Sequence, residues 1–497
     1  MITIAQANAD DARGHTSKVR PNADQILELA SNIYDFRQSE CGDTYVIDRE
    51  TRVAEPLARR GSFRQRISNL ARERFGLIPR GAALGEALET MLGITQQYPP
   101  VNVHLRIAAT PYGIWLDMAN DSGTIIKISN GTWRVCNARE WGVPIFRRTN
   151  LRPMVTPNKV DDWRVPMDDL RRLFRLPEPE FRLVLGWVVY GLTTEDRPFP
   201  ILLLQAEQGS GKSTIEKNIV RLVSPDMDET GRLLPPNDDE LGVQAYNHRV
   251  MVFDNISKIP PAKSDALCKV STGGTFSKRK LYTDAEEVHF EALRPMVIST
   301  INLGTLPPDL NERIVRINLR RIEAGERRTE TAVQNDWDNR FADMFGSALT
   351  LAAKIRQRID AGFSTSDLPR MADYGKVLAA IDLEFGDGSI GLDAYRQQQA
   401  SMAIENIADE PVWLALSLLE ASFKAPFRGS SAELLRMLQG AFHGGLQTWK
   451  KPPESAADLT RAIDSIAPAL RKAGWVVEYR TGTGRNSGSR IWTLQHQ

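Results

Sequence analysis

The 497-residue sequence predicts an α/β protein, because three largely apolar runs accompany a glycine-bearing turn. Residues 201–205, ILLLQ, show no alternation, which is typical of a strand buried on both faces of a parallel sheet. This run leads directly into AEQGSGKST at 206–214 and then into a helical pattern. Two further runs, at 249–254 and 295–300, predict neighbouring strands of the same sheet.

The bulk composition is that of an ordinary globular protein, with 42% apolar and 25% charged residues. The net charge of +1 indicates neither a nucleic acid nor a membrane partner, so a DNA-binding surface has to come from local patches. Cys41, Cys136 and Cys268 lack neighbours at zinc-ligand spacing. No apolar run reaches the roughly 18 residues of a membrane span, and no secretory signal is recognisable. We therefore expect a cytoplasmic enzyme.

Patterning divides the chain into five segments. Residues 1–24 are polar and without periodicity, which predicts a disordered lead-in. Residues 25–155 predict an N-terminal domain of helices followed by β-hairpins, whose turns are PYG, NDSG and NG. A core with leading helices is expected at 156–325 and a helical lid or linker at 326–405. Residues 406–497 predict a separate C-terminal domain.

The segment 206–214 has the pattern of a phosphate-binding loop (P-loop). Its glycines let backbone N–H groups turn toward phosphate oxygens, and the helix that follows presents its positive N-terminus. Lys212 is expected to reach the β- and γ-phosphates of ATP, and Ser213 to ligate Mg²⁺. Ala206 stands where the strict pattern has its first glycine. The predicted nucleotide-binding residues are Ala206, Glu207, Gln208, Gly209, Ser210, Gly211, Lys212, Ser213 and Thr214.

The two neighbouring strands end in polar residues that can act on a phosphate. Asp254 can hold Mg²⁺ through water. Asn255 follows where a water-orienting glutamate is usual, and a neutral amide can position water without accepting its proton. Ser299 and Asn302 can each contact the γ-phosphate or the attacking water. Glu207 is a candidate base, although a structural hydrogen bond on the loop is the commoner role for it.

Arg313 precedes a fourth predicted strand in the stretch DLNERIVRINL. In a ring of subunits, an arginine at this place can reach the ATP of a neighbour and stabilise transition-state charge. A surface ion pair is the ordinary alternative. The predicted catalytic residues are Lys212, Asp254, Asn255, Ser299, Asn302 and Arg313, and the predicted metal ligands are Ser213 and Asp254.

These four elements, in this order, resemble the core of AAA+ helicases of superfamily three. QGSGKST, VFDNIS, SDALCKVSTGG, RPMVIS and LPRMADYGKVLAA resemble stretches of helicase-like proteins of actinobacterial phages and mobile elements. Related proteins are the replication-initiator helicases of staphylococcal cassettes and pathogenicity islands, and the helicase halves of phage primase-helicases. The resemblance covers about residue 101 to the C-terminus. It implies an AAA+ ATPase core in a ring, often a hexamer, that moves on single- and double-stranded DNA alongside replication-initiation proteins.

In such motors a hairpin between the second and third core strands contacts DNA, and here the hairpin falls at 276–292. Lys278, Arg279 and Lys280 lie on its first strand, whereas its tip at 284–287 is acidic. Because phosphate contacts dominate DNA affinity, a DNA-gripping tip is normally basic. An ion-paired hairpin or a contact between subunits is therefore an equally good interpretation.

Residues 411–497 predict three helices and a two-stranded hairpin, the arrangement of a winged helix. Ser430 and Ser455 are expected to cap the second and third helices. Its basic residues, opposed locally only by Glu478, form a candidate phosphate-contacting face, although some winged helices bind proteins instead. These residues are Arg461, Arg471, Lys472, Arg480, Arg485 and Arg490.

Together these patterns favour an ATP-dependent DNA helicase or translocase that serves the replication of a phage or mobile element. Two alternatives stay open: an ATP-switched origin-binding initiator that does not unwind DNA, and an ATPase used in phage defence. No primase carboxylate pair precedes the core, so no primase activity is expected.

Overall fold

A computed structural model describes residues 20–227, 231–279, 287–304, 306–443, 450–482 and 490–496. The chain divides into two units, each treated by itself below. The first comprises Met1–Leu105, Asp121–Thr124 and Asn137–Arg148, and the second comprises Arg106–Asn120, Ile125–Cys136 and Thr149–Gln497. Residues of the expected N-terminal domain, 25–155, thus occur in both units.

The first unit packs helices against short strands. Asn22 caps its first helix, since its side chain accepts a hydrogen bond from the Gln25 N–H and the Gln25 side chain accepts one from the Asn22 N–H. That helix begins at Ala23, so the predicted lead-in overlaps it by the residues Ala23 and Asp24. The elements are α1 (Ala23–Ile33), β1 (Tyr34–Gln38), β2 (Thr44–Asp48), β3 (Val53–Pro56), α2 (Ser62–Phe75), α3 (Gly81–Thr95), β4 (Val103–Leu105) and β9 (Ile145–Arg147).

The predicted hairpins are confirmed where the described strands pair. β5 pairs antiparallel with β6 across the PYG turn, and β6 with β7 across NDSG. Trp133 on the next strand is buried, and its indole N–H donates to Thr350 Oγ1 at 2.9 Å. This bond ties the strands to a helix more than 200 positions away. The strands are β5 (Ile107–Thr110), β6 (Gly113–Asp117), β7 (Thr124–Ser129) and β8 (Thr132–Asn137).

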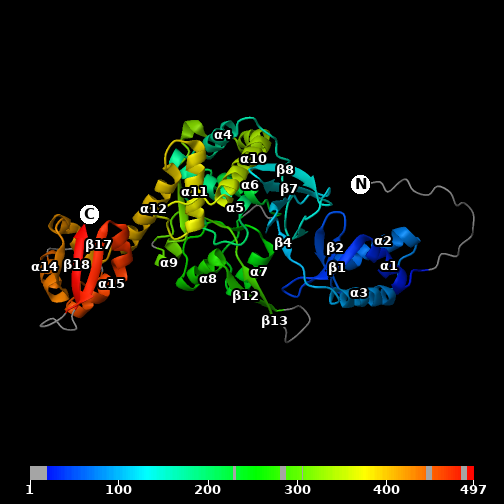
Figure 1. Cartoon of the computed structure of the whole chain (residues 1–497), viewed down its shortest axis with the longest axis horizontal. Coiled ribbons are helices and arrows are strands. Elements are labelled where there is room, and N and C mark those ends of the chain that lie inside the picture. Colours follow the sequence, from blue (N-terminus) through cyan, green and yellow to red (C-terminus); the bar gives the residue numbers. More distant parts are fainter. Residues whose placement is uncertain are drawn as a thin grey trace, which may run out of the picture. The chain divides into compact units, whose positions relative to one another are not determined.

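A four-stranded parallel sheet in the order β11-β14-β10-β15 carries the candidate site. Two helices that contact it, α5 and α6, are labelled in Figure 1. Residues 201–204 are all buried, as their unbroken apolar run predicts. Since the strands are parallel, the carboxyl ends of β10, β11 and β14 meet at one edge of the sheet, where open α/β sheets bind ligands. The strands are β10 (Ile201–Ala206), β11 (Met251–Phe253), β14 (Met296–Thr300) and β15 (Ile314–Leu319).

Helices cover this sheet and share its main hydrophobic core. α5 is buried from Phe181 to Thr193, as a core helix is. The helices of the expected lid, α10 to α12, contribute to the same core, and Arg182 on α5 forms ion pairs with Asp382 and Asp387. The helices are α4 (Arg164–Phe174), α5 (Glu178–Thr193), α6 (Lys212–Val223), α7 (Asp238–Asn247), α8 (Pro261–Thr272), α9 (Pro308–Asn311), η1 (Ala324–Glu326), α10 (Glu330–Asp360), α11 (Ala372–Phe385) and α12 (Ile390–Ile407).

The C-terminal residues form helices around a three-stranded antiparallel sheet, with β18 between β16 and β17. Both expected caps are confirmed, because Ser430 Oγ accepts from the Glu433 N–H and Ser455 Oγ from the Asp458 N–H. Strand β16 was not predicted. The elements are α13 (Pro411–Leu418), η2 (Glu420–Phe423), β16 (Phe427–Ser430), α14 (Ser431–His443), α15 (Ala456–Lys472), β17 (Trp475–Thr481) and β18 (Arg490–His496).

Candidate phosphate-binding site

The 206–214 loop runs from the carboxyl end of β10 to the first turn of α6. Gly209 and Gly211 have φ of +80° and +77°, in the left-handed region that side chains with a Cβ rarely adopt. The backbone conformation of the loop therefore requires glycine at both of these positions. The loop lines a cavity of about 280 Å³ together with Asn255 and Ile301.

Lys212 and Asp254 meet at the edge of this cavity. Lys212 Nζ lies 3.2 Å from Asp254 Oδ1, and the Asn255 N–H donates to the same oxygen at 2.7 Å. Ser299 Oγ donates a short hydrogen bond to it as well. Burial by itself raises the pKa of Asp254, but the bonds from Ser299 and Lys212 outweigh burial and lower that pKa below its ordinary value. Asp254 is therefore held as an anion at neutral pH.

Glu216 joins this group, and sequence analysis missed it. It lies four residues after Lys212 on α6, so both side chains occupy one face of the helix. Its side chain is buried, and burial raises its pKa to about 7. The hydrogen bond from Ser299 opposes that shift, and the charge of Asp254 adds to it. The i, i+4 spacing from Lys212 is the one sequence signal that points to it.

The side chains at the loop also suit the nucleotide phosphate and the Mg²⁺ ion that the sequence predicts there. Ser210 Oγ is buried and has no hydrogen-bond partner in the described structure, although it lines the cavity. An unpartnered hydroxyl next to a lysine can donate to a phosphate oxygen. Ser213 and Asp254 offer a hydroxyl and a carboxylate, which suits Mg²⁺ because that ion keeps several waters and uses phosphate oxygens as further ligands. Among the described residues, no group of three or more His, Cys, Asp or Glu side chains forms a ready-made metal site.

Other predicted site residues lie elsewhere or serve other contacts. Glu207 is an exposed member of the cavity wall. Asn302 is exposed, and its side chain accepts a hydrogen bond from the Gly304 N–H. Arg313 does not line the cavity: it is 7% exposed and forms an ion pair with Asp309 at 2.7 Å. Within this chain Arg313 is thus paired near the start of β15, away from the loop.

The predicted DNA-contacting hairpin is confirmed as a pair of strands, β12 (Gly274–Arg279) and β13 (Glu287–Ala292). In its register Lys278 lies opposite Val288, and Arg279 opposite Glu287. Lys280 and residues 281–286, with Arg485 in the C-terminal region, lie outside the described residues.

The C-terminal basic residues have more acidic partners than the local sequence suggested. Arg461 pairs with Asp458 at 2.5 Å, and Lys472 with Glu312 at 2.7 Å. The expectation that Glu478 is the only acid opposing these charges locally is wrong, because Asp458 and Asp464 of the same C-terminal region pair with two of them. The remaining placements are Arg490 with Asp464 at 2.5 Å, Arg471 on the Val477 carbonyl at 3.0 Å, and Arg480 exposed on β17.

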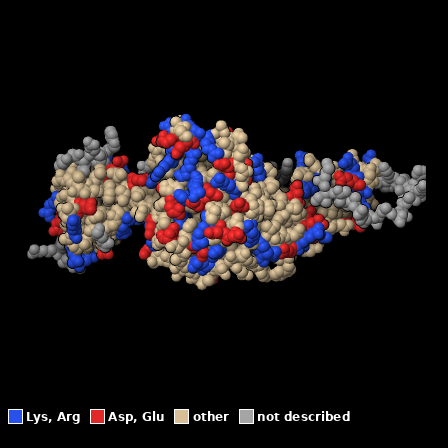
Figure 2. Space-filling view, turned by 90° about the horizontal axis from the view of Figure 1, so that it is seen from above, with Lys and Arg blue, Asp and Glu red and all other residues tan. Residues whose placement is uncertain are grey.

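Charge on the molecular surface is mixed. On the face seen in Figure 2, Lys and Arg side chains lie interspersed with Asp and Glu. The near-zero net charge of the sequence agrees with this distribution. Among the described residues, every helix is too short or too polar to span a membrane.

Two family models match parts of the chain. Residues 167–405 match the family described as actinomycete integrative conjugative element replication protein, and residues 415–497 match the AICE RepA C-terminal domain. No curated protein matches the chain.

Two solved structures align over most of the chain. The apo A form of the NrS-1 C-terminal region is 13% identical, covers 96% of this chain and 100% of its own, and has a TM-score of 0.44. SCCmec type IV Cch, described as an active helicase, is 13% identical, covers 93% of each chain and has a TM-score of 0.46. At these TM-scores neither likeness carries an inference about function. By the matches of residues 167–405 and 415–497, these two segments of the chain resemble the replication proteins of actinomycete integrative conjugative elements.

Proposed function

We propose that this protein is an ATP-dependent DNA helicase or translocase that acts as a ring in the replication of a mobile element. The observation that carries the proposal is the convergence of Lys212, Asp254 and Ser299 beside a glycine loop with an unpartnered hydroxyl. The family match to a replication protein supplies the biological setting. We assign the 206–214 loop as a P-loop, residues 156–325 as an AAA+ core and residues 406–497 as a winged helix.

In this proposal the chain's own residues bind and orient the nucleotide. The N–H groups of the loop and the Lys212 ammonium hold the β- and γ-phosphates, while Ser213 and Asp254 hold Mg²⁺. Bound Mg²⁺ supplies charge neutralisation between those phosphates. Asn255 lines the cavity and orients the attacking water through its amide. Ser299 keeps Asp254 in place by its short hydrogen bond.

A second candidate function is an ATP-switched initiator that binds an origin without unwinding it. Two features favour it over a motor: position 255 is a neutral asparagine, and Arg313 is buried in an ion pair of its own chain. To act on the ATP of a neighbouring subunit, Arg313 would have to exchange Asp309 for a phosphate. Such an exchange fits a ring that assembles only with nucleotide and DNA.

Unwinding of a forked duplex by the purified full chain, with ATP and Mg²⁺, tests the first proposal against the second. We expect strand separation with ATP and none with a non-hydrolysable analogue. Hydrolysis without strand separation on forks of either polarity would favour the initiator. The absence of both hydrolysis and nucleotide binding would overturn the assignment of the loop.

A further inference from the structure

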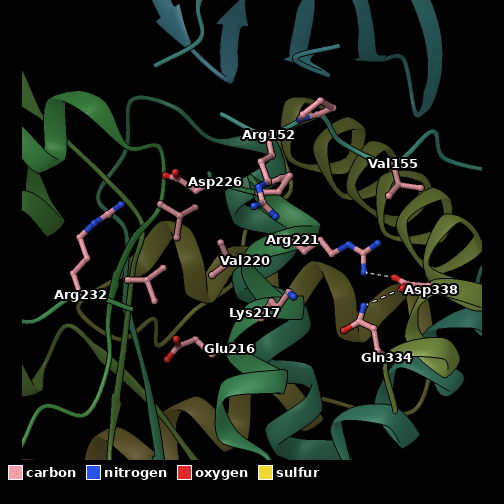
Figure 3. Close-up of a pocket in the computed structure, with 14 residues that line it drawn as sticks. Arg152, Val155, Glu216, Lys217, Val220, Arg221, Asp226, Arg232, Gln334 and Asp338 are labelled. Atoms are coloured by element: carbon pink, nitrogen blue, oxygen red, sulfur yellow. Dashed lines mark hydrogen bonds and ion pairs between the residues drawn. The ribbon is translucent and has the colours of Figure 1, made fainter. Parts of the chain in front are cut away.

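The cavity in Figure 3, of about 320 Å³, is lined by side chains of both charge signs. Arg221 forms an ion pair with Asp338 at 2.8 Å, and Gln334 donates a hydrogen bond to the same carboxylate at 3.0 Å. Because these charges are balanced inside the chain, the cavity calls for no ionic ligand. Polar side chains that lack a partner within the described residues lie on helix α2 of the first unit.

Helix α2 (Ser62–Phe75), labelled in Figure 1, has one buried side and one that faces solvent. Its buried residues recur at every fourth position and lie in the hydrophobic core that α1, α2 and α3 share. They are Phe63, Ile67 and Ala71. This apolar spacing fixes the rotation of the helix, and it therefore fixes which side chains point away from the core.

The solvent-facing side of α2 is uniformly polar. Five of its residues recur at helical spacing and form what we call the α2 face: Arg64, Gln65, Ser68, Asn69 and Arg72. Gln65, Asn69 and Arg72 are exposed, whereas Arg64 and Ser68 are half-buried. None of the five is acidic. The one acid of the helix, Glu73, lies at the border of the face, one turn after Asn69.

The exposed side chains of the α2 face have no partners inside the chain. Among the described residues, Gln65, Asn69 and Arg72 form no side-chain hydrogen bond and no ion pair. A solvated helix surface is usually laced with acids and bases that pair three or four residues apart. The α2 face lacks such pairs, so its amides and its guanidinium are available to a binding partner.

The flank of the α2 face offers a contact for phosphate. Arg64 donates to the Gly81 carbonyl at 3.4 Å, so the first residue of α3 lies beside it. Helix α3 begins without a capping side chain. Arg80, directly before α3, is exposed and forms no ion pair with a described residue. Backbone N–H groups at a helix start and nearby arginines are common phosphate contacts.

The residue types of the α2 face are those that read base edges in duplex DNA. Arginine can donate two hydrogen bonds to guanine, and asparagine or glutamine can form two with adenine. The major groove is about 12 Å wide and admits one α-helix. At about 1.5 Å per residue, the helix axis rises by about 10 Å from Gln65 to Arg72. That rise matches about three base pairs, since each adds about 3.4 Å.

We propose that α2 binds in the major groove of duplex DNA, with Gln65 and Asn69 on adenine and Arg72 on guanine. Arg64 and the start of α3 then hold an adjacent phosphate. This surface lies outside both segments that match a family model, and it gives the first unit the role of selecting a duplex sequence. The inference rests on the proposed function for its choice of DNA as the partner, but groove binding needs neither ATP nor its hydrolysis.

Selection from a pool of short random-sequence duplexes by the full chain, without nucleotide, tests the proposal. We expect an enriched sequence whose core of about three base pairs contains adenine and guanine. Gln65→Ala, Asn69→Ala and Arg72→Ala should each weaken binding of that duplex by about ten- to hundredfold and relax the preference at one base pair. Since alanine favours the helix, these exposed substitutions should leave α2 folded.

Two further variants of the same helix provide a matched control and a change in the opposite direction. Arg66 lies on the other side of α2 and pairs with Glu55 at 3.3 Å, so Arg66→Ala should bind the enriched duplex like the parent. Glu73→Gln removes the acid at the border of the face and should bind the duplex more tightly, because that acid repels phosphates.

The proposal is refuted if no sequence is enriched, or if the variants at 65, 69 and 72 select and bind the same duplexes as the parent. Loss of affinity for single-stranded probes alone would also overturn binding in the major groove. Equal thermal midpoints of the variants exclude misfolding as the cause of lost binding. A parent that selects a duplex but hydrolyses no ATP would contradict the proposed function and leave this surface standing.

Discussion

The loop site and the C-terminal basic face both bring arginine or lysine against acids, but at different levels of burial. The Lys212 and Asp254 side chains are 15% and 33% exposed, and they meet where two parallel strands end. The Arg461 and Asp458 side chains are 78% and 40% exposed, and they meet on one face of α15. An exposed pair contributes little to stability and exchanges partners readily, whereas a pair fixed at the end of a sheet keeps its partner. The loop site is therefore preorganised, and the C-terminal face is adaptable.

The largest expected effect is that of Lys212→Ala on ATP hydrolysis. Loss of the ammonium removes charge stabilisation from the phosphates being separated, so we expect the rate to fall by more than about 1,000-fold. Phosphate release by the purified variant, with Mg²⁺, measures this. Lys424→Ala, at an exposed position of the C-terminal region, is the matched control and should retain the parent rate. A Lys212→Ala protein that hydrolyses ATP like the parent would contradict the assignment of residues 206–214 as a P-loop.

Arg313→Ala distinguishes an arginine that acts between subunits from one that only pairs within its own chain. In the first case hydrolysis falls about 1,000-fold while nucleotide binding is nearly unchanged. Mixing this variant with Lys212→Ala should then restore part of the activity, because each subunit can supply what the other lacks. If Arg313 serves only Asp309, the mixture shows no recovery and the single variant loses stability instead.

Glu216→Gln tests, through the pH dependence of stability, whether the acid beside the loop site is buried and protonated. The ordinary pKa of 4.5 applies to the unfolded chain and a pKa of about 7 to the native one. Between these values the native state keeps a proton that the unfolded chain has released, so the free energy of unfolding falls as pH rises from about 4.5 to 7. The fall for this one group amounts to about 3 kcal/mol.

Urea denaturation at pH 5 and pH 8 measures that difference. We expect the variant to gain stability over the parent at pH 8 and to differ little from it at pH 5. Glu207→Gln, at an exposed carboxylate of the same loop, is the control and should leave the pH dependence as it is in the parent. A parent protein whose stability does not decline between these two pH values would contradict the buried, proton-holding state of Glu216.

The features that sequence predicts correctly here are those that a short segment specifies by itself. The unbroken apolar run of β10, the positive-φ glycines at 209 and 211, and the serine caps each depend on neighbours within a few positions. Because β10, β14 and β11 are parallel, their carboxyl ends meet, and this alone brings Asp254 to the loop. The order of these elements along the chain is what carried the family resemblance.

What sequence misses depends on contacts between distant residues. Asp464 reaches Arg490 across 26 positions, and Glu312 reaches Lys472 across 160, so no local count of charges could find them. β16 is short and exists through its pairing with β18. The role of Glu216 on α6 follows from Ser299 on β14 and from Asp254, which comes directly after β11. Tertiary pairing decided each of these features.

The smallest effects are expected at the adaptable face, where two arginines offer a direct contrast. Arg480 is exposed on β17 and has no ion pair with a described residue, whereas Arg490 is bound by both oxygens of Asp464 at 2.5 and 2.6 Å and stacks on Tyr479 at 4.2 Å. Each phosphate contact contributes about 0.9 to the slope of log affinity against log salt. If this face binds duplex DNA, Arg480→Ala should reduce that slope by about 1, and removal of residues 411–497 should reduce it further.

Arg490→Ala should change the slope less than Arg480→Ala does, because its charge is already neutralised by an acid of its own domain. Asp464→Asn frees Arg490 and should steepen the slope by up to about 1. Filter binding of the parent and the four variants across a salt series measures these differences, with sedimentation as a check on assembly. The rival role of this domain, contact with a protein, predicts equal slopes throughout and an altered oligomeric state after removal of 411–497. That result would take the C-terminal domain out of DNA binding and leave Lys278 and Arg279 of β12 as the described candidates in the second unit.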